Sequence, residues 1–181
     1  MKTIVTIIGV LACMNLVAQT NYYTKTQILS EGDHIYRCDV STSQRVTLYN
    51  INNKLTYKKQ YDRSTGTMPS IEELMKLDDT VDDKYMDIKA EKIINNAFSI
   101  AEIDRLKGAA LNVMLYISPE TGKVMEVVFS FPNFSLFATV PLSTYIKIEV
   151  DLKKTLLYVP TEYGRNLNYI FRGWMHKLKI F

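Results

Sequence analysis

Alternating apolar and polar residues predict two groups of β-strands in this chain. Near the N-terminus, residues 35–40, 46–50 and 55–61 are three strand-like runs, and the first alternates as a strand with one buried face does. An Asn-rich turn at residues 51–54 separates the second and third runs, which favours a hairpin. We therefore predict a β-meander over residues 35–61, preceded by polar, loosely ordered residues at 20–33.

The clearest hairpin lies in the second half of the chain. Residues 111–118 and 124–131 alternate, and Pro119 and Gly122 in the connection between them favour a tight turn. Each run has one strongly apolar face and one mixed face. This pattern predicts an antiparallel sheet that is covered by helices on one face, an α+β fold.

Two short helices are predicted from their capping residues. Ser70 and Ser99 are each followed three residues later by a glutamate, which is the spacing of a capping box. The first of these helices is expected to run to residue 75, and the second to be ended by Gly108, because glycine readily adopts the left-handed conformation of a helix end.

Two longer helices complete this half, over residues 88–98 and 142–157. The second segment also alternates in the manner of a strand, so its type stays open on periodicity alone. Its length and the position of Pro141 at its start favour a helix. A last strand is predicted at residues 174–181.

Residues 1–18 have the layout of a secretory signal peptide. Lys2 precedes an uncharged apolar run that is too short to span a bilayer, and Ala18 suits cleavage by a signal peptidase. We therefore expect a secreted or periplasmic protein with one domain at residues 19–181, made of the meander at 35–61 and a helix/hairpin/helix/strand part at 70–181. Cys13 loosely resembles the cysteine of a lipobox, and a lipoprotein is the less favoured alternative.

The composition fits a single folded domain. Of the 181 residues, 47% are apolar and 23% are charged, which argues against disorder and against a polytopic membrane protein. The formal net charge of +3 is too small to indicate nucleic acid as a partner. Once the signal is removed, we expect no stable membrane span.

The sequence does not contain the familiar signatures of catalysis or cofactor binding. The seven glycines form no phosphate-binding fingerprint, and an acidic run at residues 72–91 fails the spacing of a calcium loop. The histidines, His34 and His176, have no ligand-like neighbours, and Cys38 fits the buried face of a strand. We expect no enzyme, cofactor or metal, although a carboxylate pair formed in three dimensions stays open.

A binding surface is the remaining hypothesis. The chain has twelve tyrosines, a residue type that gives large contact areas in binding sites but is also favoured in sheets. A polar loop at residues 161–169 concentrates some of them. The candidate binding residues are Tyr163, Arg165, Asn166 and Tyr169. The expected partner is an envelope or extracellular protein, with a glycan or another small ligand as the alternative.

The second half of the chain resembles the TonB C-terminal domain and secreted domains related to it. The resemblance is carried by Leu106-Lys107-Gly108, by Thr121-Gly122-Lys123-Val124 at the hairpin tip, and by residues 141–157. The whole chain is similar to small exported domains of unknown function from Gram-negative gut anaerobes. The resemblance implies an α+β fold and an interaction role in the envelope, in which an exposed edge strand pairs with an extended peptide.

Overall fold

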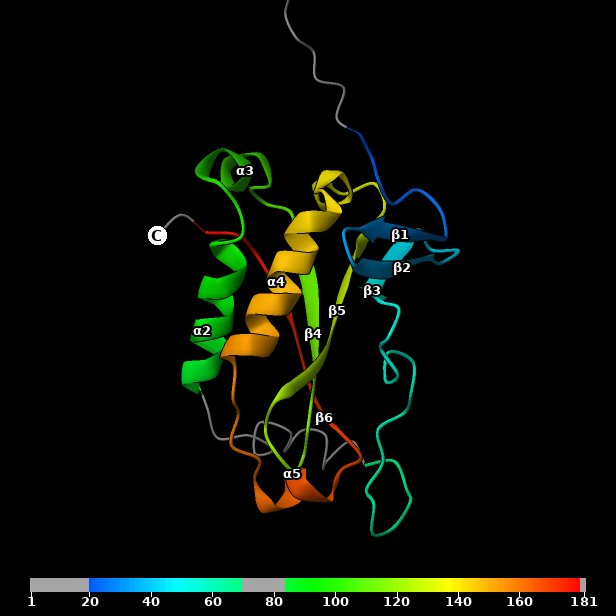
Figure 1. The fold of residues 1–181 in the computed structure, drawn as a ribbon, viewed down its shortest axis with the longest axis vertical. Helices are drawn as coiled ribbons and strands as arrows, with labels where there is room; N and C mark the ends of the chain where they lie inside the picture. Colours follow the sequence, from blue (N-terminus) through cyan, green and yellow to red (C-terminus); the bar gives the residue numbers. More distant parts are fainter. Residues whose placement is uncertain (1–19, 70–83, 180–181) are drawn as a thin grey trace, which may run out of the picture.

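The computed structural model describes residues 20–69 and 84–179, which form one antiparallel sheet with helices on one face (Figure 1). In chain order, the elements are β1 (Gln27–Glu31), β2 (His34–Val40), β3 (Arg45–Asn50), α2 (Lys84–Asn95), α3 (Ile100–Arg105), β4 (Leu111–Ile117), β5 (Val124–Pro132), the 3₁₀ helix η2 (Leu136–Thr139), α4 (Leu142–Thr155), α5 (Glu162–Asn166) and β6 (Ile170–His176). The predicted α+β fold with an antiparallel sheet is confirmed.

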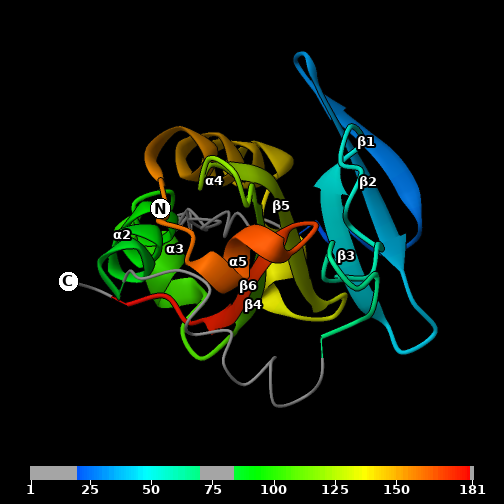
Figure 2. The same ribbon diagram turned by 90° about the horizontal axis from the view of Figure 1, so that it is seen from below.

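The six strands lie in the order β1-β2-β3-β5-β4-β6, and each neighbouring pair is antiparallel. The β1–β3 meander therefore joins the β4–β5 hairpin through β3 and β5, where Val46 pairs with Phe131. Strand β6 returns to pair with β4, with Val113 opposite Trp174. Figure 2 shows that β1 and β2 extend away from the helices at one end of the sheet.

Helices α2 and α4 cover one face of the sheet, which we call the helix face. The two helices lie next to each other, and α4 packs on β5. Helix α4 buries Tyr145, Ile148 and Leu152, and α2 contributes Ala90 and Ile94 to the same core. The predicted helix at residues 142–157 is confirmed, because one apolar stripe turned toward a sheet outweighs the alternating pattern. None of the helices in the described residues is long and apolar enough to cross a membrane.

Residues 20–33 are more ordered than predicted. Residues 27–31 form β1, which pairs with β2, and Tyr23 is fully buried. The Tyr23 hydroxyl donates to the carbonyl of Val140 at 3.1 Å, and its ring lies 5.4 Å from that of Phe131. The prediction of loose order was wrong because one buried tyrosine and a strand partner outweigh a polar composition.

The third strand predicted for the meander, at residues 55–61, is also wrong. The free side of β3 is taken by β5, and residues 51–62 instead run as turns and irregular chain over the other face of the sheet, which we call the outer face. Leu55 packs there against a small apolar cluster formed by Tyr49, Tyr116, Val128 and Tyr169. The other apolar residues of the predicted strand, Tyr57 and Tyr61, are exposed.

The other predicted elements agree with the structure to within a few residues. The β4–β5 hairpin and its tight turn are confirmed, with Gly122 at a φ of +69°. The helix predicted at residues 88–98 is α2, and the capping box of Ser99 and Glu102 opens α3. The last strand was placed too late, because β6 ends at His176. The signal peptide at residues 1–18 and the helix predicted at 70–75 lie outside the described residues.

Candidate functional site

The open edge of β6 is the most distinctive surface of the described chain. Strand β4 occupies one side of β6, with Met114 opposite Gly173, and no strand of the described residues pairs with the other side. An edge strand presents backbone N–H and C=O groups that can pair with a further strand. Seven residues are enough for several such hydrogen bonds.

A cavity of about 500 Å³ lies along this edge on the helix face. It is lined by Arg172 and Trp174 of β6 and by Asp87 and Glu91 of α2. The Arg172 guanidinium donates from Nη2 to Asp87 Oδ2 at 2.6 Å. Lys179 Nζ lies 3.5 Å from Glu91 Oε2. Both carboxylates are more than a third exposed, which is typical of surface ion pairs and not of an acid–base pair in a desolvated active site.

A second hollow, an open trough of about 450 Å³, lies on the outer face of the same strand. Phe171, Gly173 and Met175 alternate along β6 and turn toward this face, next to Met114 of β4. The other lining residues are Trp174 of β6 and three polar residues of other strands, namely Arg45, Asn112 and Ser130. The two hollows thus flank one strand edge, one on each face of the sheet.

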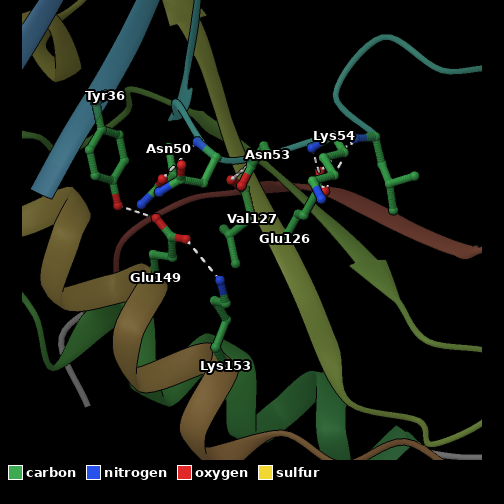
Figure 3. Close-up of polar contacts among 10 residues, drawn as sticks. Tyr36, Asn50, Asn53, Lys54, Glu126, Val127, Glu149 and Lys153 are labelled. Atoms are coloured by element: carbon green, nitrogen blue, oxygen red, sulfur yellow. Dashed lines mark hydrogen bonds and ion pairs between the residues drawn. The ribbon is translucent and has the colours of Figure 1, made fainter.

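The outer trough ends where residues 51–62 cover the sheet, and Glu126 holds this segment in place. The Glu126 carboxylate, which is nearly buried, accepts the backbone N–H groups of Lys54 at 2.6 Å and Leu55 at 2.9 Å. The Asn53 side chain donates to the carbonyl of Val127 at 3.1 Å (Figure 3). These contacts fix how much of the outer face stays open beside β6.

A second buried carboxylate, Glu149 of α4, lies on the helix face (Figure 3). The Tyr36 hydroxyl donates to Glu149 Oε2, and Lys153 Nζ donates to Oε1 at 3.3 Å. Burial, together with the negative charge of Glu149, raises the pKa of Tyr36 above its ordinary value. Both oxygens of Glu149 therefore have partners: the Tyr36 contact ties α4 to β2, whereas the Lys153 contact lies within α4. Because Glu126 and Glu149 lie on opposite faces of the sheet, they form no catalytic pair.

The four predicted binding residues do not form one exposed surface. Arg165 and Asn166 are exposed on α5. Tyr163 is half-buried and packs against the main core. Tyr169 is 4% exposed, and its hydroxyl donates to the carbonyl of Lys58 at 2.6 Å. In this structure Tyr169 holds the segment over the outer face and is not available to a partner.

Cys38 and His176 are both buried in the sheet. Cys38 is buried in β2, and burial raises the pKa of its thiol to about 11, which disfavours the reactive thiolate. His176 is buried at the end of β6, where burial lowers its pKa. Within residues 20–69 and 84–179, no group of three or more His, Cys, Asp or Glu side chains is arranged to hold a metal ion.

The comparisons with known proteins agree with this architecture. The sequence profile of DUF5043, a domain of unknown function, matches residues 19–174. The chain belongs to the DUF5043 family. A crystal structure of a DUF5043 family protein from Bacteroides uniformis is similar to it, with 39% sequence identity and a TM-score of 0.81 over 88% of this chain and 89% of that chain. No curated protein matches the chain.

The sequence alone did not point to the β6 edge. Residues 174–181 were expected to be a strand, but its position at the edge depends on the sheet order, which periodicity does not reveal. One signal was available in the sequence of the DUF5043 chain: Phe171, Gly173 and Met175 alternate with Arg172 and Trp174. This alternation places different residue types on the two faces of the strand.

Proposed function

We propose that this DUF5043 protein is an exported, non-enzymatic interaction domain of the cell envelope that binds a partner protein at the edge of β6. In this mode, an extended segment of the partner adds a seventh strand to the sheet. Main-chain hydrogen bonds supply affinity, and the hollows on either side of the edge receive alternate side chains. No catalytic group is needed.

The proposed export is supported by the sequence of residues 1–18. A short positive start, an apolar run and Ala18 have the layout of a signal peptide, and the family match begins at residue 19, directly after the expected cleavage site. The resemblance of the second half to the TonB C-terminal domain is in line with the same binding mode, because relatives of that domain pair an exposed edge strand with an extended peptide.

The observation that carries the binding proposal is the coincidence of an open strand edge with hollows on both of its faces. Soluble proteins commonly protect sheet edges with lysine, proline or a covering element. The exposed member of β6 on the outer face is instead Met175, which is 62% exposed. An open edge beside an exposed apolar side chain is typical of a strand that pairs with something else.

The test compares two single substitutions at the two ends of the sheet. Met175→Lys places a charge beside the β6 edge, and Ile28→Lys places the same charge on β1, where Ile28 is 51% exposed. Residues 19–181 of each variant are used to capture proteins from an envelope extract. We expect wild type and Ile28→Lys to retain the same specific partner and Met175→Lys to lose it, with melting temperatures unchanged for both.

Equal capture by the two variants would contradict binding at β6. If Ile28→Lys alone lost the partner, the interaction would be assigned to the opposite edge. Detection of full-length protein with residues 1–18 still attached in the cytosol would contradict the proposed export.

A glycan is the second candidate ligand, and the outer trough favours it. Arg45, Asn112 and Ser130 offer donors and acceptors beside the aromatic ring of Phe171, a combination suited to sugar hydroxyls. A melting temperature that rises with a defined oligosaccharide, and that no longer rises in Asn112→Ala, would support this ligand. Retention of the protein partner by Asn112→Ala would separate the two functions.

A further inference from the structure

We infer that the segment added to β6 alternates apolar side chains with basic ones. This inference rests on the proposed function, because it names the chemistry of the strand that the β6 edge would accept. An added strand continues the pleat of the sheet, so its successive side chains turn toward opposite faces. One hollow therefore receives the odd-numbered side chains of the partner segment, and the other receives the even-numbered ones.

The outer face of the β6 edge is suited to apolar side chains. Phe171 and Met175 stand on either side of Gly173, and the ring of Phe171 lies so close over Gly173 that an added Cβ there would be 3.0 Å from the ring. The thioethers of Met114 and Met175 are flexible and polarisable, so they adapt to apolar partners of different shape. A valine or leucine side chain from an added strand would be removed from water in this trough.

The helix face of the same edge carries accessible negative charge. The side chains of Asp87 and Glu91, which line the cavity, are 42% and 39% exposed, whereas that of Arg172, which also lines it, is only 18% exposed. Lys179 is 58% exposed but is not among the residues that line the cavity. Arg172 forms an ion pair with Asp87, and Lys179 makes a longer and more exposed ion pair with Glu91. Because exposed ion pairs are weak, a cation from the partner can compete for these carboxylates.

Trp174 adds a further reason for a basic side chain on this face. Trp174 lines the helix-face cavity together with the two acidic residues of α2, Asp87 and Glu91. A lysine or arginine stem can lie along an aromatic ring while its charge reaches a carboxylate, an arrangement stabilised by cation–π attraction. Acidic side chains would be repelled at the same position.

Trp174 also supplies the measurement, because it is the single tryptophan in the chain. Two synthetic peptides, VKVKVKV and VEVEVEV, are titrated into residues 19–181 while tryptophan fluorescence is followed. We expect VKVKVKV to bind at least about tenfold more tightly, since each partly exposed charge pair changes affinity up to about fivefold. The preference should shrink in 0.5 M salt.

Four variants and one modified peptide locate the effect. Asp87→Asn and Glu91→Gln should each reduce the preference for the basic peptide, whereas Glu31→Gln, on the exposed β1 edge, should leave it unchanged. A VKVKVKV peptide that is N-methylated at every residue has no backbone N–H to donate to the β6 edge and should not bind. Met175→Lys should weaken both peptides, because it acts on the apolar side of the edge.

The outcomes separate this inference from the proposed function. Equal binding of the two peptides, lost with N-methylation, would overturn the basic pattern and leave strand addition intact. Failure of both peptides to bind would count against strand addition itself. Strand β6 carries a similar alternation, so a dimer of the chain alone that is abolished by Met175→Lys would overturn the inference by assigning the edge to a second copy.

Discussion

At the scale of single residues, the two buried glutamates show how this fold supplies hydrogen-bond donors to buried carboxylates. Glu126 accepts backbone N–H groups from a segment without regular structure, and Glu149 accepts side-chain donors from β2 and α4. Glu126 holds the segment over the outer face, and Glu149 links α4 to β2. The contribution of each contact to the free energy of unfolding can be measured.

Glu126→Ala should destabilise the protein by about 2–3 kcal/mol, because two backbone N–H groups lose a charged acceptor. Urea unfolding of residues 19–181 measures the loss. The same variant should be cut faster by trypsin after Lys58 and Lys59, since the segment over the outer face is released. Glu120→Ala, which removes an exposed ion pair with Arg63, is the matched control and should cost under about 1 kcal/mol. Equal losses would contradict this role for Glu126.

Tyr36→Phe should cost about 1–3 kcal/mol, because Glu149 keeps its burial and loses its buried hydroxyl donor. Lys153→Met removes the partially exposed donor on the other oxygen and should cost less, since water can replace an exposed ammonium group. Thermal or urea unfolding compares the two. A larger loss for Lys153→Met would contradict this order and would show that the ion pair within α4 contributes more to stability than the hydrogen bond from Tyr36.

At the scale of elements, the β4–β5 hairpin depends on contact between its tip and a distant part of the chain. Gly122 accepts the backbone N–H of Tyr158 at 2.9 Å, and a Cβ at Gly122 would lie 1.8 Å from the carbonyl oxygen of Tyr158. The turn therefore needs glycine for two reasons, its positive φ and this close approach.

Gly66 separates these two reasons, because it has the same φ of +69° and no atom within 4 Å of its missing Cβ. Gly66→Ala should cost about 1–2 kcal/mol from backbone strain alone. Gly122→Ala should cost clearly more, because the backbone of residue 158 must move as well. Urea unfolding of both variants gives the comparison, and equal losses would mean that the close approach adds nothing to stability.

The elements also show which parts of the fold the sequence could predict. The alternation in β4 and β5 and the capping box of α3 are local patterns, and both are confirmed. The failure at residues 55–61 has a long-range cause, because β5 from far along the chain takes the edge that a third meander strand would need. The candidate site was missed for the same reason, since only the complete sheet order makes β6 an edge.

At the scale of the whole molecule, stability depends on a core without disulfides. Cys38 is the single cysteine of residues 19–181 and is free and buried, so the sheet and its helices are held together by packing. The chain continues beyond β6 along α2, where Asn95 accepts the backbone N–H of Lys179 at 3.1 Å. His176 is buried at the start of this closing segment and couples it to pH.

Burial lowers the pKa of His176 from its ordinary value of 6.5, although nearby Glu91 raises it and Lys179 lowers it further. Between the folded-state pKa and 6.5, the unfolded chain binds the proton and the folded chain does not, so the free energy of unfolding falls as the pH falls through this range. Urea unfolding of residues 19–181 between pH 7.5 and pH 5 should show this decline. His176→Gln should reduce the decline, and His34→Gln, the matched control, should leave it unchanged. Carboxylates with lowered pKa values, such as Asp39 and Glu120, act only at lower pH, so a decline that persists in His176→Gln would show that another group causes it.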